Sequence, residues 1–322
     1  MGIPKYSVSN ILVVQIGKLG DMILTTPLFH ELKRLYPNAK LTVLASELNQ
    51  NILKEQSVIN EVLIYKKSFL PLLKLLFTLK NRRYDLWIDP KNEKSDTSRF
   101  LMKYAKPVNS LGYNFGDKVY DIDLTNKELG NHAVDIYLTP IKALDPAFVP
   151  APKTPVMEIP GEVKNSIKAL LPGSSNNIFI NLSAGQPARH WEIDNWIAVI
   201  NEINSLGEYT FLLNAFGINE ADLSLLKTSI QGKYILVDHL SQLEIAEAIR
   251  NSMIVISPDT SAVHFASGFN IPVIDLMNNV PWNIERFAPL SEKQKILISN
   301  DENTLKSITP ENVITAFKEL SK

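Results

Sequence analysis

An aspartate follows the first apolar segment of the chain, in a short loop that contains two glycines. The segment ILVVQIG (11–17) runs into Lys18-Leu19-Gly20-Asp21, and a helical pattern begins near Thr25. Glycines at such a turn permit positive φ and the close approach of a partner. Their spacing fits neither the G-x-G-x-x-G dinucleotide fingerprint nor the G-x-x-x-x-G-K-S/T phosphate loop. Two roles for Asp21 therefore stay open: a helix cap, or a catalytic carboxylate.

A second candidate site is the start of a helix that directly follows the segment MIVISPD (253–259). We expect Asp259 to cap this helix, which leaves the backbone N–H groups of Thr260-Ser261-Ala262 pointing outward. Free donors and the helix dipole bind phosphate at such a position, and the two hydroxyls in this run add further donors. His264 lies one helical turn further along the same face. The alternative is an ordinary capped helix with a buried histidine.

A third candidate loop follows the segment NIFINLSAG (177–185), and its residues of interest are Ala184, Gly185, Arg189 and Trp191. The small residues let a ligand approach the backbone, and arginine offers a permanent charge with a forked donor set that suits phosphate. For Trp191, packing beneath a helix competes with stacking on a ligand. Glu220, at the start of the helix after YTFLLNAFG (209–217), is either a ribose-binding carboxylate or a solvated one.

These loops depend on strands that read as runs of Val, Ile and Leu, a pattern typical of strands buried on both faces. In the first half they are expected at 11–17, 40–46, 61–65 and 84–90, with weaker candidates near Leu111 and at 119–124. In the second half they are expected at 177–185, 209–217, 234–240, 253–259, 272–277 and 295–300. Segments of helical period separate them, which indicates βαβ units and parallel sheets.

The chain length and one proline-rich segment indicate two domains. At roughly 100–200 residues per domain, 322 residues suggest two. Residues 146–160 hold five prolines and no periodic pattern, so they are expected to form a semi-rigid linker. We therefore predict domains at 1–150 and 151–322, both α/β with doubly wound parallel sheets, and a ligand cleft shared by the carboxyl ends of their strands. A closing helix at 310–321 belongs to the second domain, with packing back on the first as an alternative.

Composition excludes several classes of function. The chain carries 33 Lys and Arg against 34 Asp and Glu, a net charge of −1, and no cysteine. This balance of charge argues against electrostatic binding of nucleic acid. Without cysteine there is no disulfide, thiolate zinc site, iron–sulfur cluster or cysteine nucleophile, which fits a reducing compartment. The first residues lack the apolar core of a signal peptide. We expect a soluble, cytoplasmic monomer.

One leucine-rich segment, FLPLLKLLFTLKNRR (69–83), has two interpretations. Its apolar part is well short of the ~20 residues that span a bilayer. Its leucines recur at helical spacing among Lys74, Lys80, Arg82 and Arg83. The segment is therefore either a helix packed on the sheet or a helix that contacts the inner membrane peripherally.

Four motifs occur in order along the chain: residues 11–46, YDLWIDPKNEKS (84–95), ARHWEIDNW (188–196) and SPDTSAVHFASGFNIPVIDL (257–276). Together they resemble the motifs of glycosyltransferase family 9, the heptosyltransferases that transfer heptose from ADP-heptose onto the lipopolysaccharide inner core. The resemblance implies a GT-B fold of two Rossmann-like domains facing a central cleft. It also implies inversion at the anomeric carbon, with no metal or other cofactor beside the ADP-sugar co-substrate.

The resemblance assigns roles residue by residue. Asp21 matches the general base, Arg189 a phosphate-binding lysine, Glu220 a ribose-binding glutamate and Leu240 an adenine contact. The donor-binding positions are Ala184, Gly185, Arg189, Glu220, Leu240, Asp259, Thr260, Ser261, Ala262 and His264. The positions implied to face a phosphorylated, lipid-linked or oligosaccharide acceptor are Lys91, Lys94, Ser95 and His132.

The sequence also departs from the family pattern. Gln15 stands where Arg or Lys is usual, Ser261 replaces a glycine, and residues 277–290 lack the usual F-G-P-T signature. A hydroxyl-bearing residue and an arginine still permit phosphate binding, so we predict an inverting, metal-independent transfer of heptose from ADP-heptose. The alternatives are a relative that uses another nucleotide-sugar, such as a UDP-sugar, and a nucleotide-binding protein without transferase activity. An NAD-dependent oxidoreductase is disfavoured because G-x-G-x-x-G is missing.

Overall fold

The computed structural model describes residues 8–149, 154–171 and 176–322. The chain divides into two compact units, Met1–Glu158 and Ile159–Lys322. Each unit contains a parallel six-stranded sheet, so the predicted α/β class with two doubly wound sheets is confirmed.

The sheet of the first unit has the strand order β3-β2-β1-β4-β5-β6. Its strands are β1 (Asn10–Gln15), β2 (Lys40–Ser46), β3 (Glu61–Tyr65), β4 (Leu86–Ile88), β5 (Asn109–Gly112) and β6 (Ile122–Asp123). The order reverses between β1 and β4, which are neighbours with Ile11 opposite Leu86. Open α/β sheets bind ligands outside the carboxyl ends of the strands at such a reversal.

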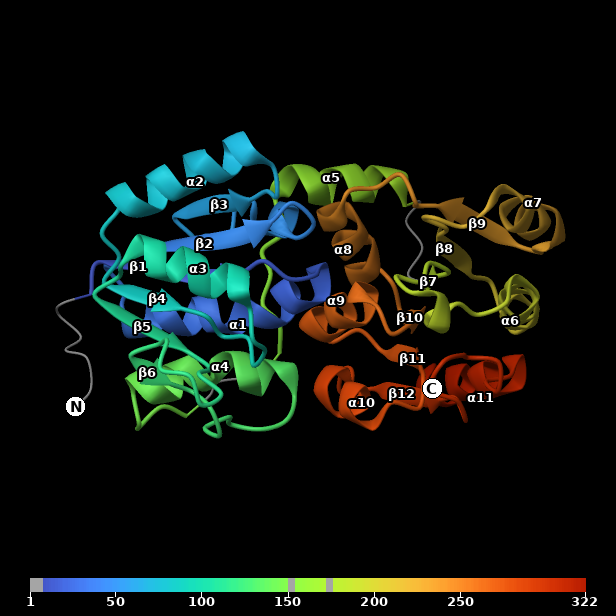
Figure 1. Cartoon of the computed structure of the whole chain (residues 1–322). Coiled ribbons are helices and arrows are strands. Elements are labelled where there is room, and N and C mark those ends of the chain that lie inside the picture. The colour runs from blue at the N-terminus through green and yellow to red at the C-terminus, as the bar shows by residue number, and fades with distance from the viewer. Residues whose placement is uncertain (1–7, 150–153, 172–175) are drawn as a thin grey trace. The chain divides into compact units, whose positions relative to one another are not determined.

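Helices cover both faces of this sheet (Figure 1). They are α1 (Leu19–Leu35), α2 (Phe69–Asn81), α3 (Asp96–Ala105) and α4 (Ala133–Leu144), with a short 3-10 helix at Gln50–Leu53. Leu12 and Val14 of β1 point toward α2 and α3, in a core that includes Leu75 and Leu101. The alternate side chain Gln15 points the other way and donates to Thr25 Oγ1 of α1. Helix α4 packs beside α1.

The second unit repeats this topology with the order β12-β11-β10-β7-β8-β9. Its strands are β7 (Asn177–Asn181), β8 (Thr210–Asn214), β9 (Lys233–Leu236), β10 (Ile254–Pro258), β11 (Val273–Met277) and β12 (Gln294–Ile298). Its helices are α5 (Gly161–Leu170), α6 (Ile193–Ser205), α7 (Glu220–Ser229), α8 (Gln242–Arg250), α9 (Ser261–Phe269), α10 (Pro281–Phe287) and α11 (Pro310–Leu320), with a 3-10 turn at Pro187–Arg189. The strand order reverses between β7 and β10.

The core of the second unit explains two features of its sequence. Trp191 and Trp196 are buried edge to face, with ring centroids 4.7 Å apart, so packing rather than stacking on a ligand is the role of Trp191. The Trp191 indole donates to the carbonyl of Ile308. Val313 and Phe317 of α11 lie in the same core, so the closing helix is part of the second unit.

One helix start differs from the sequence-based expectation, and part of the predicted linker is described. Helix α1 begins at Leu19 rather than near Thr25, which places Asp21 inside its first turn. In the predicted linker, the described residues 155–160 form no helix or strand, and residues 150–153 lie outside the described ranges. The N–H groups of Val156 and Glu158 donate to Thr26 Oγ1 and Gln56 Oε1. This part of the linker is therefore held by side chains of the first unit.

Candidate active site

Asp21 is buried in the first turn of α1 and receives contacts from three elements. Its side chain is 8% exposed, and Oδ2 accepts a hydrogen bond from the backbone N–H of Lys18 at 3.1 Å. Oδ1 accepts from the Tyr137 hydroxyl of α4 at 2.8 Å, and Lys91 Nζ lies 3.4 Å from Oδ2. The bond to Lys18 satisfies the helix start, as the capping interpretation requires. The two side-chain contacts go beyond a cap, because they orient both carboxylate oxygens.

Lys91 carries a charge that is matched to this carboxylate. Burial lowers the pKa of Lys91, but the carboxylates of Asp21 and Glu93 outweigh burial and raise it above its ordinary value. Glu93 Oε2 lies 3.2 Å from Lys91 Nζ. The ammonium is therefore fully charged at neutral pH and lies beside the Asp21 carboxylate.

A pocket of about 260 Å³ opens at the carboxyl ends of β1 and β4, where the strand order reverses. It is lined by Val14, Gln15, Ile16, Gly17, Asp89, Lys91, Glu93, Lys94, Ser95 and Ser98. Three of the four predicted acceptor residues thus line one pocket. Asp21 is bonded to one of these lining residues, Lys91, and lies against another, Gly17, so its carboxylate lies beside the pocket.

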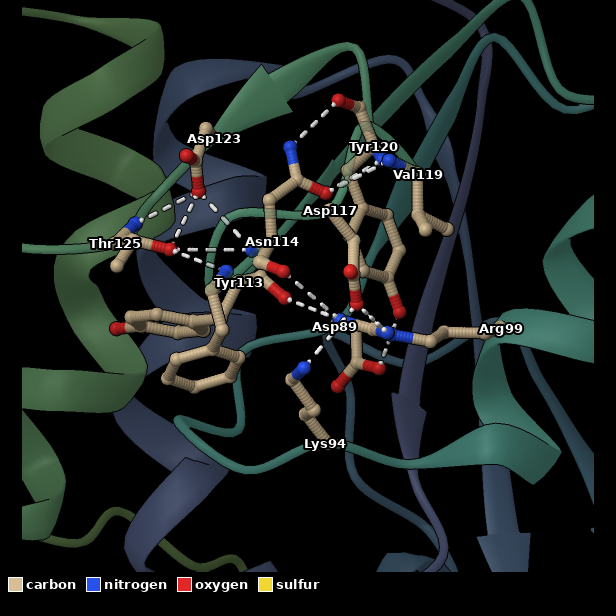
Figure 2. A network of polar contacts seen from close by, with 11 residues as sticks. Asp89, Lys94, Arg99, Tyr113, Asn114, Asp117, Val119, Tyr120, Asp123 and Thr125 are labelled. Carbon is tan, nitrogen blue, oxygen red and sulfur yellow. Dashed lines mark hydrogen bonds and ion pairs between the residues drawn. The ribbon is translucent and has the colours of Figure 1, made fainter.

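Figure 2 shows how Lys94 is held at the edge of this pocket. Lys94 Nζ lies 3.3 Å from Asp117 Oδ2, and Arg99 Nη1 of α3 lies 2.7 Å from the same oxygen. Bonds from Arg99 and Lys94 hold the pKa of Asp117 below its usual range. Arg99 also donates to the backbone carbonyls of Tyr113 and Asn114. The loop after β5 is therefore fastened to α3 next to the pocket.

Asp89, at the floor of the pocket, is a buried acid. Its Oδ2 accepts a hydrogen bond from the Tyr120 hydroxyl at 2.8 Å (Figure 2). Burial raises the pKa of Asp89, and burial together with the Asp89 charge raises the pKa of Tyr120. Ser95 caps α3 by accepting from the N–H of Ser98. The pocket thus presents one helix start and two lysines, with acidic groups beneath them.

His132 serves as the cap of α4. Its Nδ1 accepts a hydrogen bond from the backbone N–H of Val134 at 3.2 Å, and it does not line the pocket. The same helix carries Tyr137, whose hydroxyl reaches Asp21. The helix that His132 starts thus connects it to the Asp21 site.

In the second unit, Arg189 forms an ion pair with the buried Asp259, while the arginine itself is partly exposed. Arg189 Nη2 lies 2.7 Å from Asp259 Oδ2, and Nη1 donates to the Asp259 carbonyl at 2.7 Å. Asn283 of α10 donates to Asp259 Oδ2 at 2.7 Å. The expected cap role of Asp259 is therefore wrong: Thr260 is the cap of α9, and its Oγ1 accepts from the N–H of Ala262. Asp259 holds the arginine because its carboxylate has a cation and an amide within reach.

The remaining predicted donor residues follow the carboxyl ends of four neighbouring strands, β10, β7, β8 and β9. Ser261 is half-buried at the start of α9, and His264 is buried with its ring 6.3 Å from that of Phe287. Ala184 and Leu240 are half-buried, while Gly185 and Glu220 are exposed. A Cβ at Gly185 would meet no atom within 4 Å, so the loop is open there. The topology thus collects these residues at one edge of one sheet.

Sequence reasoning missed several residues that touch predicted site residues, and two of them bind the predicted aspartates. Tyr137 contacts Asp21 from 116 positions away, and Asn283 contacts Asp259 from 24 positions away. No local pattern marks either of them. Asn283 lies in residues 277–290, the segment that lacks the usual F-G-P-T signature of the family. That departure points to the segment but not to this residue.

Among the residues that the structure describes, no cluster of three or more histidine, aspartate or glutamate side chains is arranged to hold a metal ion. Within the same described ranges, no helix combines the length and the apolar character needed to cross a bilayer.

Comparisons with known proteins agree with this architecture. The sequence model of glycosyltransferase family 9 (heptosyltransferase) matches residues 72–315. The lipopolysaccharide heptosyltransferase 3 of Escherichia coli is 24% identical over 289 residues, covering 82% of this chain and 84% of that protein. A family 9 glycosyltransferase structure from Veillonella parvula has a TM-score of 0.83 at 18% identity, covering 97% of both chains. The E. coli ADP-heptose lipopolysaccharide heptosyltransferase II has a TM-score of 0.77 at 19% identity, covering 97% of this chain and 98% of its own. These structures share the predicted GT-B fold class.

Proposed function

Because the chain belongs to glycosyltransferase family 9, the heptosyltransferases, we propose that it transfers heptose from ADP-heptose to a lipopolysaccharide inner-core acceptor. The names of the E. coli relatives support this donor and this class of acceptor. The observation that carries the proposal is the buried Asp21 carboxylate, oriented by Tyr137 and Lys91 beside a pocket lined by two lysines at the reversal of the first sheet.

In the proposed reaction Asp21 is the general base. As the acceptor hydroxyl attacks the anomeric carbon, its proton passes to the Asp21 carboxylate, a new C–O bond forms, and the bond to the diphosphate breaks. ADP leaves with the bonding electron pair, and the anomeric centre is inverted because attack comes from the opposite face. A positioned base contributes roughly 10²–10⁴-fold to the rate. Lys91 supports the role by holding the Asp21 carboxylate in position through their ion pair.

The donor is proposed to bind at the carboxyl edge of the second sheet. The start of α9 offers its helix dipole, although the Ala262 N–H that was expected to be free donates to Thr260 Oγ1. Arg189 adds a positive charge where negative charge develops on the leaving diphosphate. Glu220 and Leu240 are proposed at the ribose and the adenine. No step in this mechanism needs a metal ion, so transfer in the presence of EDTA is expected.

The acceptor is proposed to bind the pocket of the first unit through an anionic group. Lys91 and Lys94 supply positive charge, and the α3 start beside Ser95 supplies a helix dipole. Replacing Lys91 with Gln should raise the KM for the acceptor and leave the Kd for ADP unchanged. Replacing Lys94 with Gln should have a smaller effect, because the Lys94 side chain is more exposed than that of Lys91.

We also propose that the enzyme docks peripherally on an anionic membrane, the expected location of a lipid-linked acceptor. Helix α2 exposes Phe69, Leu70, Leu73 and Phe77 on the side opposite the buried Leu75 and Leu79. Phe100 of the adjoining helix α3 is 53% exposed. Residues 62–84 contain six Lys and Arg and no acidic residue. Apolar side chains surrounded by positive charge are typical of helices that bind anionic lipid surfaces.

Flotation with vesicles that contain anionic lipid tests this docking. The wild type should float, and a variant with Phe69→Ser and Phe77→Ser should not. A variant with Phe216→Ser, which removes a phenylalanine of similar exposure from the second unit, should float like the wild type. Equal flotation of all three proteins, or of none, would remove the membrane from the proposal.

The central experiment offers the purified protein ADP-heptose and an inner-core acceptor, with and without EDTA, and measures transfer. Asp21→Asn should keep the Kd for ADP while kcat falls by at least about a hundredfold. Tighter binding of UDP than of ADP would redirect the proposal to another donor. Binding of ADP without transfer or hydrolysis of ADP-heptose would indicate a nucleotide-binding protein that has lost the activity.

A further inference from the structure

Asn181 links the carboxyl ends of three neighbouring strands in the second unit. It is the last residue of β7, lies between β10 and β8 in the sheet, and is 3% exposed. Its Oδ1 accepts a hydrogen bond at 2.8 Å from Nδ2 of Asn214, the last residue of β8. Its own Nδ2 lies 3.1 Å from Ser257 Oγ of β10 and 2.9 Å from Thr260 Oγ1 at the start of α9.

The same amide holds the loop that follows β7. Asn181 Nδ2 donates to the backbone carbonyl of Ser183 at 3.1 Å. Ser183 immediately precedes Ala184 and Gly185, which are two of the proposed donor-binding positions. One side chain therefore fastens both the loop after β7 and the start of α9, the two segments proposed to surround the diphosphate.

The Thr260 hydroxyl belongs to this hydrogen-bond network. Thr260 Oγ1 accepts from the N–H of Ala262 at 3.3 Å and from Asn181, so both of its lone pairs are used. Ser257 Oγ donates to the carbonyl of Pro258 at 2.6 Å and lies 3.0 Å from Thr260 Oγ1, which leaves Ser257 as the acceptor for the Thr260 proton. The orientation of the Thr260 hydroxyl, which caps α9, is thus determined by its hydrogen bonds to Asn181 and Ser257.

We infer that Asn181 is a positioning residue for donor binding, which sets the start of α9 and the loop at Ser183 without touching the nucleotide-sugar. The inference rests on the proposed function, because it takes the diphosphate to bind at these two segments. Without the amide, Thr260 loses one of its fixed partners and Ser183 loses its anchor. The N–H groups at the helix start then sample other positions, and an ordered site binds phosphate better than a mobile one.

The chain offers a matched control on the same strand. Asn177 is the first residue of β7, is also 3% exposed, and donates through Nδ2 to the carbonyl of Asn251 at 3.1 Å. It lies at the amino end of the strand, away from the proposed donor site. Asn177→Leu and Asn181→Leu therefore remove the same group from the same strand at similar burial.

The experiment measures the Kd for ADP by calorimetry and the Tm of each full-length variant. Asn181→Leu should weaken ADP binding about tenfold or more, which corresponds to the energy of about one hydrogen bond. Asn177→Leu should lower the Tm about as much as Asn181→Leu does, but it should change the Kd for ADP by less than about threefold. Asn214→Leu removes only the hydrogen bond to Asn181 Oδ1 and should give a Kd between those of the wild type and Asn181→Leu. It replaces Asn181→Leu in the test if that variant does not fold.

The results distinguish the positioning role of Asn181 from the assignment of the donor site. The positioning role would be overturned if Asn181→Leu and Asn214→Leu both had the Kd of the wild type, or if Asn177→Leu weakened ADP binding equally. In either case ADP binding by the wild type would still support the donor site. A wild type that does not bind ADP would overturn the donor assignment itself, and the inference with it.

Discussion

The hydroxyl of Tyr137 donates a hydrogen bond to Asp21 Oδ1 over 2.8 Å, although the two residues are 116 positions apart. The bond connects α4 to the first turn of α1, and both side chains are buried. Asp21 Oδ2 is held separately by the N–H of Lys18 and by Lys91. The carboxylate thus has one orientation before any substrate arrives, which favours its use as a base.

Replacing Tyr137 with Phe should lower kcat about tenfold and leave the Kd for ADP unchanged. The variant removes one donor to a charged acceptor, and such a bond contributes about 1.5–3 kcal/mol. Steady-state kinetics at saturating donor measure the effect. Tyr113→Phe is the control, because its buried hydroxyl donates to the carbonyl of Ile136 on the same helix rather than to Asp21. An equal loss of kcat in both variants would contradict the positioning of Asp21 by Tyr137.

Replacing Gly17 with Ala should displace Asp21 and reduce kcat by at least about tenfold. A Cβ at Gly17 would lie 2.7 Å from Asp21 Oδ2 and 3.0 Å from Gln15 Oε1. The backbone cannot easily retreat, because Ser46 Oγ and Asn49 Nδ2 both donate to the Gly17 carbonyl. Gly161→Ala adds a methyl group where no atom lies within 4 Å and should leave kcat unchanged. Full activity of Gly17→Ala would show that the carboxylate position is not critical.

Replacing Arg189 with Ala should reduce both stability and ADP binding. The change leaves the carboxylate of Asp259, which is 4% exposed, without its cation, at a cost of about 3–5 kcal/mol. The double variant with Asp259→Asn should recover stability, since the buried charge is gone, and should still bind ADP weakly. Urea unfolding and calorimetry measure the two effects. Recovery of the Kd in the double variant would remove Arg189 from the phosphate site.

Asp275 on β11 should make the protein less stable as the pH rises. Its side chain is fully buried, and within the described part of the chain neither carboxylate oxygen has a hydrogen-bond partner. Burial raises the pKa of Asp275 well above its usual range, and the charge of Asp259 raises it further while Arg189 opposes. The folded state therefore keeps a proton that the unfolded chain releases near pH 4. The stabilisation by this group is fully present below about pH 4. It is lost progressively as the pH rises from there to the pKa of Asp275 in the folded state.

Asp275→Asn should remove this pH dependence. The variant should match the wild type near pH 4 and gain relative stability toward pH 8, by up to about 1.4 kcal/mol per pH unit. Urea unfolding at several pH values between 4 and 8 measures the difference. Glu302→Gln, at an exposed position, should give a difference that does not change with pH. A flat difference for Asp275→Asn would mean that the buried carboxyl ionises as readily as an exposed one.

Much of the fold was predictable from local patterns in the sequence. Strands buried on both faces must be apolar throughout, so runs such as ILVVQIG and MIVISPD indicated β1 and β10 to within about two residues. Alternation with helices implies parallel sheets, and the loops after the strands then collect at one edge. The same patterns indicate Asp21 and Arg189, whereas only the family resemblance indicates Lys91. Two ends were misjudged: α1 begins earlier, and Thr260 rather than Asp259 caps α9.

Apolar runs that alternate with helical segments are thus enough to predict two parallel sheets and the residue types in the loops after their strands. Which of those loop residues come into contact depends on the tertiary packing. The contacts of Tyr137 with Asp21 and of Asn181 with both Asn214 and Thr260 join elements that are distant in the chain. A hydrogen bond needs its two atoms within about 3.2 Å in a favourable direction, whereas periodicity specifies only which face of an element a residue occupies. The packing of α4 on α1, and of β7 between β10 and β8, supplies that missing precision.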